Sequence, residues 1–310
     1  MKLDISEQSL PVYEALASNV RIQIIHLLSG RPMNVRELAE ALGLSSAIMT
    51  MHVKKLERAG IISCAMVPSK GGAAQKMCSL QVDSIEILFP DKLAGRREFH
   101  KTEVSIGHFT DFDIVPTCGI CTPDKVIGMF DDPRYFLAPD RVHAKILWFG
   151  QGFIEYKLPN YLMNSELPEE LEISMEISSE APGTNNEWPS DITFYLNNVR
   201  LGTWTSPGDF GSNPGKLNPS WWFSDINQYG LLKRLMVTKE GTYMDGAKLS
   251  DVTIDRLDVR QKQWTFRLAV ERDAEHVGGL TLFGSAFGNY SQDIVFKLYY
   301  SKLPQPGHDK

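Results

Sequence analysis

Long apolar runs and cysteine are both scarce in this chain of 310 residues. No apolar stretch approaches the about 20 residues that a helix needs to cross a bilayer. The first ten residues, MKLDISEQSL, contain no apolar core of the kind that signal peptides carry. Four cysteines are too few for a disulfide scaffold. We therefore expect a reduced, cytoplasmic protein that does not associate with membranes.

Positive charge is also in deficit. The chain has 32 Lys and Arg residues against 38 Asp and Glu residues, a net charge of −6. This balance argues against a protein that coats nucleic acid through bulk positive charge. Apolar residues make up 43% and charged residues 23% of the chain, which is typical of a globular protein rather than a disordered one. At about 100–200 residues per domain, the length predicts about two domains.

Aromatic residues are nearly absent from residues 1–90, which contain only Tyr13 and Phe89, whereas all six tryptophans come later. The charge divides at the same place. Residues 1–90 hold nine basic and eight acidic residues, a net of +1, and the rest of the chain has a net of −7. We therefore predict two domains, residues 1–90 and residues 100–304, joined by a linker over residues 91–99.

Residues 1–90 carry the periodicity and the end signals of four helices. Apolar spacing predicts helices over residues 10–17 and 19–30. Asn34 followed by Glu37 forms a capping box before a third helix that ends at Gly43. Ser45 caps a fourth helix, and we expect its core stripe to be Ile48, Met49, Val53 and Leu56. Two β-like stretches, residues 61–67 and 75–82, follow with a flexible hairpin tip between them. This order is that of a winged helix-turn-helix.

The charge of this segment supports contact with DNA. Residues 45–80 contain five basic residues against one acidic residue, a net of +4. A recognition helix needs short polar side chains near its start to reach base edges, and lysines beside it to hold phosphates. The candidate DNA-binding residues are Ser45, Ser46, Ala47, Thr50, Met51, His52, Lys54, Lys70 and Lys76.

The run Leu42-Gly43-Leu44-Ser45, followed by HVKKLERAGII at residues 52–62, resembles the winged-helix repressors of the ArsR type, which are bacterial transcription regulators. The resemblance covers residues 9–82. It implies a homodimer that binds a pseudo-palindromic operator in double-stranded DNA and is released or remodelled when a signal arrives. Members that sense metals carry cysteines on the helix before the recognition helix. Residues 35–42 contain none, so we expect no metal site there and no cofactor. The alternative is that this pattern forms a protein-contact module.

The four cysteines fall into two pairs. Cys64 and Cys78 lie on the two predicted wing strands, where we expect small, half-buried apolar side chains rather than a redox pair. Cys118 and Cys121 have the spacing of half a zinc site, but a second pair is missing. We expect a structural role for them in a turn, with metal binding as the alternative.

From about residue 97, short apolar or alternating runs are separated by turns rich in glycine, proline and asparagine. Runs such as residues 103–109, 144–149, 153–158, 191–196, 248–257 and 264–270 predict strands, and Asn197-Asn198 predicts a tight type I′ hairpin turn. We therefore predict an α+β multidomain chain, in which the winged helix-turn-helix precedes a large jelly-roll-like β-sandwich. The second half, for example residues 171–182 and 279–294, also resembles the C-terminal domain of predicted ArsR-type regulators of Gram-positive bacteria. That resemblance implies no particular ligand.

Residues 203–229 form the segment of this half that is richest in aromatic, Asp and Asn residues. Flat aromatic side chains beside carboxylates and amides suit a carbohydrate, because the rings stack on C–H surfaces and the polar groups bind hydroxyls. The candidate ligand-binding residues are Trp188, Trp204, Asp209, Trp221, Trp222 and Tyr229. The alternative is that Trp221 and Trp222 hold a long loop on the core.

We interpret the chain as a DNA-binding transcriptional regulator whose β-sandwich senses a small molecule, with a carbohydrate as the favoured effector. The sandwich's acidity predicts that it stands away from DNA. One alternative is a sandwich that serves only dimerisation or partner docking. Another is a carbohydrate-active enzyme fused to a DNA-binding domain. We expect no enzyme and no catalytic residues, because the carboxylates of the second half lack a signature spacing.

Overall fold

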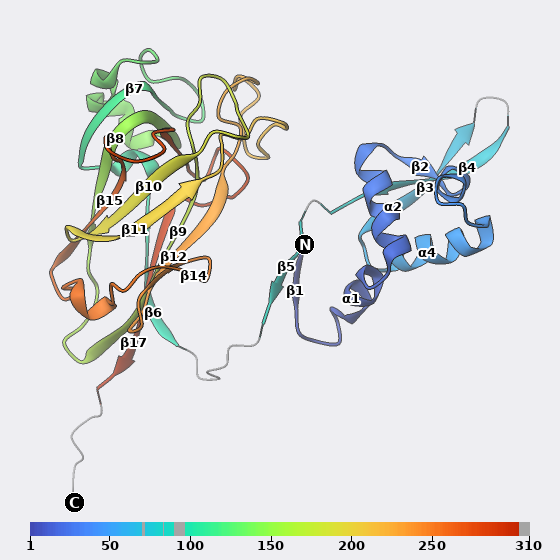
Figure 1. Ribbon diagram of the computed structural model, residues 1–310, viewed down its shortest axis with the longest axis horizontal. Helices are drawn as coiled ribbons and strands as arrows, with labels where there is room; N and C mark the ends of the chain where they lie inside the picture. Colours follow the sequence, from blue (N-terminus) through green and yellow to red (C-terminus); the bar gives the residue numbers. More distant parts are fainter. Residues whose placement is uncertain (70–71, 83, 90–96, 304–310) are drawn as a thin grey trace, which may run out of the picture. The chain divides into compact units, whose positions relative to one another are not determined.

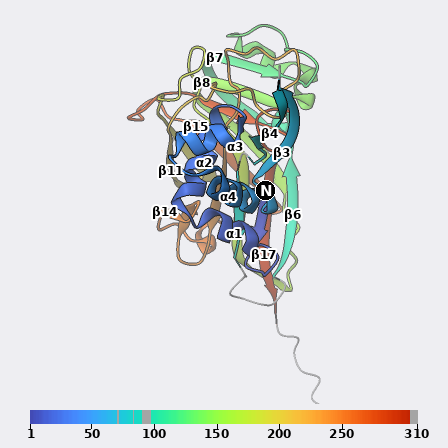
Figure 2. The ribbon, with the colours of Figure 1, turned by 90° about the vertical axis from the view of Figure 1, so that its right-hand side faces the viewer.

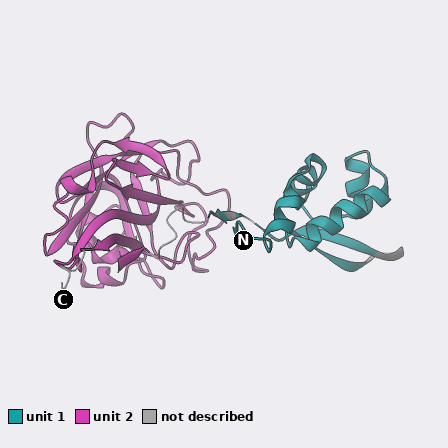
Figure 3. Cartoon of the chain, turned by 90° about the horizontal axis from the view of Figure 1, so that it is seen from below, with its two compact units in different colours: residues 1–95 teal, residues 96–310 magenta. Residues whose placement is uncertain are grey.

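The computed structural model describes residues 1–69, 72–82, 84–89 and 97–303. The chain divides into two compact units, Met1–Gly95 and Arg96–Lys310 (Figure 3). The first is small and helical and the second is built of antiparallel strands, so the predicted α+β multidomain class is confirmed. Most of the expected linker, residues 91–96, lies outside the described residues. Its last two residues, Glu98 and Phe99, are already part of a strand, because they pair with the strand that ends the second unit.

The N-terminal unit has the order of a winged helix-turn-helix (Figure 1). Figure 2 shows its helices gathered beside the β3–β4 hairpin. Its elements are β1 (Lys2–Asp4), α1 (Leu10–Leu16), α2 (Asn19–Gly30), β2 (Met33–Asn34), α3 (Val35–Ala41), α4 (Ser46–Arg58), β3 (Ile62–Ser69), β4 (Gly72–Leu80) and β5 (Glu86–Leu88). Strands β2, β4 and β3 form one sheet, and β1 pairs with β5 in parallel.

Local capping places the two helices of the helix-turn-helix. The Glu37 backbone N–H donates to Asn34 Oδ1 at 2.9 Å, and the Asn34 N–H donates to Glu37 Oε2 at 2.7 Å. This reciprocal pair confirms the predicted capping box. Gly43 has φ +63°, which allows the chain to turn between α3 and α4. The Ser45 hydroxyl accepts from the Ile48 N–H at 3.4 Å and begins α4.

The core of this unit includes all but one of the α4 residues that the apolar pattern predicts. Met49, Val53 and Leu56 of α4 are buried against Ile24 and Leu38. The expectation that Ile48 belongs to the same stripe is wrong, because this side chain is 45% exposed. Successive residues of a helix are turned by about 100°, so the face that buries Met49 directs its neighbour toward solvent.

The described part of the second unit, residues 97–303, contains twelve strands and four short 3₁₀ helices. The strands are β6 (Glu98–Val104), β7 (Asp111–Cys121), β8 (Ile146–Pro159), β9 (Glu166–Ser178), β10 (Ser190–Leu196), β11 (Val199–Ser206), β12 (Leu231–Val237), β13 (Thr242–Met244), β14 (Ala247–Ser250), β15 (Gln263–Val270), β16 (Leu280–Phe283) and β17 (Ile294–Lys302). The 3₁₀ helices span Ile106–His108, Pro133–Leu137, Pro139–His143 and Ile254–Arg256.

These strands form the two layers of a β-sandwich. One layer has the order β11-β10-β15-β8-β7, and the other has the order β6-β17-β9-β12-β13-β14. Strand β16 pairs with both β8 and β9 and joins the layers. Between them, Phe266 of β15 meets Phe296 of β17 edge to face, with ring centroids 5.4 Å apart. Alternate residues of β15 therefore face this core, and those between them face outward.

Several local predictions are settled by this fold. Asn197 and Asn198 have φ values of 49° and 64°, which confirms the predicted hairpin turn. The strands expected over residues 103–109 and 248–257 are too long, because β6 and β14 end early and each is followed by a 3₁₀ helix. Cys118 and Cys121 lie at the end of strand β7 and not in a turn.

Candidate functional site

The outward face of α4 collects most of the residues predicted to contact DNA. Ser45, Ser46, Ala47 and Met51 are exposed. Thr50 is half-buried, and its hydroxyl donates to the Ser46 carbonyl within the helix at 2.7 Å. The helix therefore presents a continuous accessible surface, although the hydroxyl of Thr50 already has a partner.

His52 lies at the margin of this face. It is half-buried, and its Nδ1 has no hydrogen-bond partner among the described residues. Burial lowers the pKa of His52 below its usual 6.5, and the nearby charges of Arg21 and Lys55 lower it further. The imidazole is consequently neutral at physiological pH, and it can contact a base edge without adding positive charge.

The three predicted phosphate-binding lysines differ in their surroundings. Lys54 is exposed and has no ion pair among the described residues. Lys76 Nζ lies 2.7 Å from Glu57 Oε2, so its charge is partly neutralised within the unit. Lys70 lies outside the described residues. Lys54 is thus the lysine of this set that is free to meet a phosphate.

The predicted carbohydrate-binding tryptophans support a loop from inside. Trp222 is 8% exposed and packs edge to face on Phe287 and Trp148, with ring centroids 4.9 and 6.1 Å apart. Its Nε1 donates to the Asn227 carbonyl at 3.2 Å, and Trp221 Nε1 donates to the Pro123 carbonyl at 2.6 Å. Both indoles therefore make contacts that hold the loop in place.

Three of the other four candidates are also engaged within the unit. Asp209 is fully buried, and its Oδ2 accepts from the Ala181 N–H at 3.2 Å. Lys233 lies over the Trp204 ring at 4.6 Å, and Tyr229 stacks on Phe210 with centroids 5.6 Å apart. Trp188 is half-buried. None of the six predicted residues lines the hollows described next.

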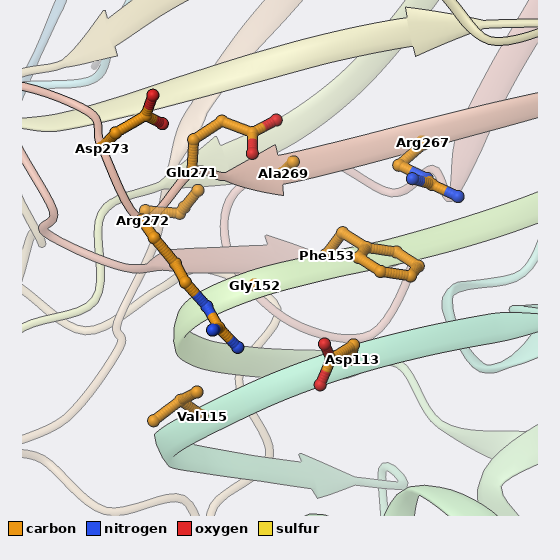
Figure 4. A pocket seen from close by; sticks show the side chains of 10 residues that line it. Asp113, Val115, Gly152, Phe153, Arg267, Ala269, Glu271, Arg272 and Asp273 are labelled. Carbon is orange, nitrogen blue, oxygen red and sulfur yellow. The ribbon is translucent and has the colours of Figure 1, made fainter.

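A hollow of about 420 Å³ lies instead on the outer side of β7, β8 and β15 (Figure 4). A smaller hollow of about 110 Å³ adjoins it and shares Arg267. The larger one is lined by Asp113, Val115, Gly152, Phe153, Arg267, Ala269, Val270, Glu271, Arg272 and Asp273. Strand register explains the grouping, because Phe153 of β8 lies opposite Asp113 of β7 on one side and Ala269 of β15 on the other.

Arg267 stands between the two hollows in a fixed position. Its guanidinium donates to Glu155 Oε2 at 2.7 and 3.0 Å and lies over the Phe153 ring at 4.0 Å. Beside it, the Tyr195 hydroxyl donates to Glu271 Oε1 at 2.8 Å. These contacts preorganise one guanidinium, one carboxylate and one aromatic ring around an open space.

Three charged side chains of the hollow are not used by the fold. The side chains of Arg272, Asp113 and Asp273 are exposed and form no hydrogen bond or ion pair with other described residues. Figure 4 shows Arg272 extending toward the strand that carries Asp113 and Val115. The hollow therefore offers two cations and three carboxylates, of which several remain available to a ligand.

The four cysteines lie in two separate places in the structure. Cys64 and Cys78 lie opposite each other on β3 and β4, with their sulfur atoms 2.7 Å apart, and burial raises the pKa of Cys64 to about 12. Cys118 and Cys121 are buried in different apolar clusters. No group of three or more His, Cys, Asp or Glu side chains able to hold a metal occurs in the described part of the chain.

No helix among the described residues is long and apolar enough to span a membrane. Residues 18–63 match the bacterial regulatory protein ArsR family. An uncharacterized HTH-type transcriptional regulator of Methanocaldococcus jannaschii is 37% identical over 54 residues, which make up 17% of this chain and 57% of that protein. This chain thus spans less than two thirds of the length of that curated relative.

Two solved structures are also similar. HlyU from Vibrio cholerae has 23% identity and a TM-score of 0.21, covering 24% of this chain and 76% of its own. A carbohydrate-binding module, CBM36 in complex with calcium and xylotriose, has 10% identity and a TM-score of 0.26, covering 65% of this chain and 99% of its own.

Proposed function

The N-terminal unit contains an ArsR-family helix-turn-helix domain, and on that premise we propose that the chain is a cytoplasmic transcriptional regulator. It binds a DNA operator through α4 and senses a carbohydrate through its β-sandwich. Its active form is a homodimer, so the operator has two related half-sites. The observation that carries the DNA-binding part is the accessible face of α4, on which Lys54, Lys55 and Arg58 are all exposed.

The DNA-binding proposal is tested with the full chain and duplexes selected in vitro from a random-sequence library. Lys54→Ala should weaken binding several-fold. It should also lower the slope of log affinity against log salt by about 1, because one phosphate contact is lost. Lys239→Ala removes an exposed lysine of the second unit and is the matched control. Selection of no duplex, or equal affinity and slope for Lys54→Ala and wild type, would refute this assignment.

The carbohydrate proposal rests on the hollow beside Arg267. Sugar hydroxyls both donate and accept, so they need carboxylates and guanidinium groups fixed around one space. The near balance of two cations against three carboxylates favours a neutral ligand over a polyanion. Another hollow, of about 510 Å³, is less suitable, because its Lys125 and Lys145 are already paired with Asp140 and Asp293.

A glycan array probed with the full chain tests this part of the proposal. We expect binding to a restricted set of neutral glycans, and we expect Arg272→Ala and Asp113→Asn to reduce it at least tenfold. Arg256→Ala removes another exposed arginine of the same unit, outside the hollow, and should bind like wild type. Absence of binding across the array would favour the alternative in which the sandwich serves dimerisation or partner docking.

We propose no enzymatic step for this chain. The fully buried carboxylates, Glu176 and Asp209, lie inside the second unit and not in the hollow. Glu271 of the hollow accepts a hydrogen bond from Tyr195, and Glu155 of the adjoining smaller hollow accepts hydrogen bonds from Arg267. Turnover of a bound glycan by the pure protein would overturn this view and favour a carbohydrate-active enzyme fused to a DNA-binding domain.

A further inference from the structure

We propose that the N-terminal half of α4 recognises thymine methyl groups in the major groove, with Ile48 and Met51 as the specificity-determining residues. This inference rests on the proposed DNA-binding function and goes beyond it. Ile48 is 45% exposed and Met51 is 52% exposed. Neither side chain contributes to the core, because the buried side of α4 is formed by Met49, Val53 and Leu56.

The outward face of α4 is divided between two kinds of side chain. Its first half carries Ala47, Ile48 and Met51, and its second half carries Lys54, Lys55 and Arg58. At 1.5 Å per residue, about 17 Å separates the ends of this face, which is somewhat more than the about 12 Å width of the major groove. When the apolar half lies in the groove, the basic half reaches the phosphates at its edge.

Ser46 and His52 are the short polar side chains near the start of α4 that remain to read other base patterns. The Thr50 hydroxyl donates to the Ser46 carbonyl, and the Ser45 hydroxyl accepts from the Ile48 N–H. His52 is half-buried. Base edges other than thymine present donors and acceptors that an apolar side chain would leave without partners, whereas the thymine methyl is an apolar group.

Charge complementarity favours DNA as the occupant of this patch. Across residues 54–58, three cations accompany one acidic residue, Glu57, and that carboxylate is paired with Lys76. The apolar patch therefore continues directly into a cationic surface, which suits a polyanion that also exposes methyl groups.

Replacing thymine by deoxyuridine in the selected duplex removes only the methyl group, so it tests this inference directly. Burial of one such group predicts about fourfold weaker binding per methyl for the wild-type chain. Ile48→Ser and Met51→Ser should bind the thymine and deoxyuridine duplexes equally. Ile22→Ser makes the same change at a 41% exposed position of α2 and should keep the wild-type ratio.

Thermal unfolding and light scattering of each variant complete the experiment. Equal wild-type affinity for the thymine and deoxyuridine duplexes would overturn the inference while the proposed DNA-binding function stands. If no duplex is selected at all, the proposed function fails as well. A change of oligomeric state in Ile48→Ser, with the thymine preference unchanged, would also overturn it and identify the patch as a protein contact.

Discussion

The buried carboxyl group of Glu180 accepts hydrogen bonds from three side chains. Thr117 and Thr281 donate to it at 3.1 Å each, and Asn227 donates to it as well. These bonds favour the charged form, but burial outweighs them and raises the pKa of Glu180 to about 8, with the neighbouring charge of Asp209 adding to the effect. Burial also raises the pKa of Glu176 and of Asp209 to about 7 each. The native sandwich therefore holds protons that the unfolded chain releases.

We predict that the second unit loses stability as pH rises from 5 to 8.5. A carboxyl whose pKa is raised on folding stabilises the native state fully below its unfolded pKa, and this contribution disappears as pH passes the folded value. Calorimetry should show Tm falling by on the order of 5 °C across this window. Glu180→Gln, which cannot ionise, should lose much of that slope.

Glu275→Gln is the matched control for this experiment, because Glu275 is exposed. It should retain the pH dependence of wild type. A slope of Tm against pH that is the same in Glu180→Gln and wild type would show that Glu180 is not the group that titrates.

At the scale of elements, the capping box of α3 supports the helix before the recognition helix. Asn34→Ala removes the acceptor of the Glu37 N–H and the contact of Asn34 Nδ2 with Gln75 Oε1 at 3.0 Å. We predict that this substitution lowers the free energy of unfolding of the first unit by about 1 kcal/mol. Asn34→Ser, which can still cap the helix, should recover most of the loss.

Urea unfolding of both variants measures this prediction. Equal stability of Asn34→Ala and wild type would show that the box adds nothing to the fold. Equal losses in Asn34→Ala and Asn34→Ser would assign the effect to the contact with β4 and not to capping.

Elements set by neighbouring residues could be predicted from the sequence. The box at Asn34, the cap at Ser45 and the turn at Asn197-Asn198 each depend on a few adjacent residues. The sequence pattern wrongly predicts that Ile48 is buried, because an apolar residue next to the core stripe of a helix fits the periodicity nearly as well as a residue of the stripe. The structure shows which side of the helix is covered.

The hollow could not be predicted in the same way. Asp113, Phe153 and Arg267 come from three strands that are far apart in the chain, and only strand register brings them together. The sole local signal is a charged residue, Arg267, alternating with apolar residues in β15. The loop over residues 203–229 had the composition of a sugar site, but aromatic side chains serve packing equally well.

At the scale of the whole molecule, the acidic balance belongs to one part of the chain. Residues 1–90 have a net charge of +1, whereas the rest has a net charge of −7. A negative sandwich adds nothing to the affinity for DNA through its charge. Under the proposed function, the sandwich influences DNA binding through a ligand that has different affinities for the DNA-bound and free states.

Thermodynamic linkage predicts how glycan binding and operator binding affect each other. If a glycan bound in the hollow changes the affinity for operator DNA, the operator must change the affinity for that glycan by the same factor. Factors of about 5 to 150 are typical of such coupling. Calorimetric titration of the full chain with the glycan, with and without a saturating duplex, gives the factor by which the duplex changes the affinity for the glycan. Titration with the duplex, with and without the glycan, gives the factor by which the glycan changes the affinity for the duplex.

Arg272→Ala should remove this coupling, so that added glycan no longer changes the affinity for the duplex. Arg256→Ala should keep both factors, because Arg256 lies outside the hollow. A glycan that binds wild type tightly yet leaves the affinity for the operator unchanged would separate the two activities. The sandwich would then bind its ligand without regulating the helix-turn-helix, and the sensing role would have to be abandoned while DNA binding stands.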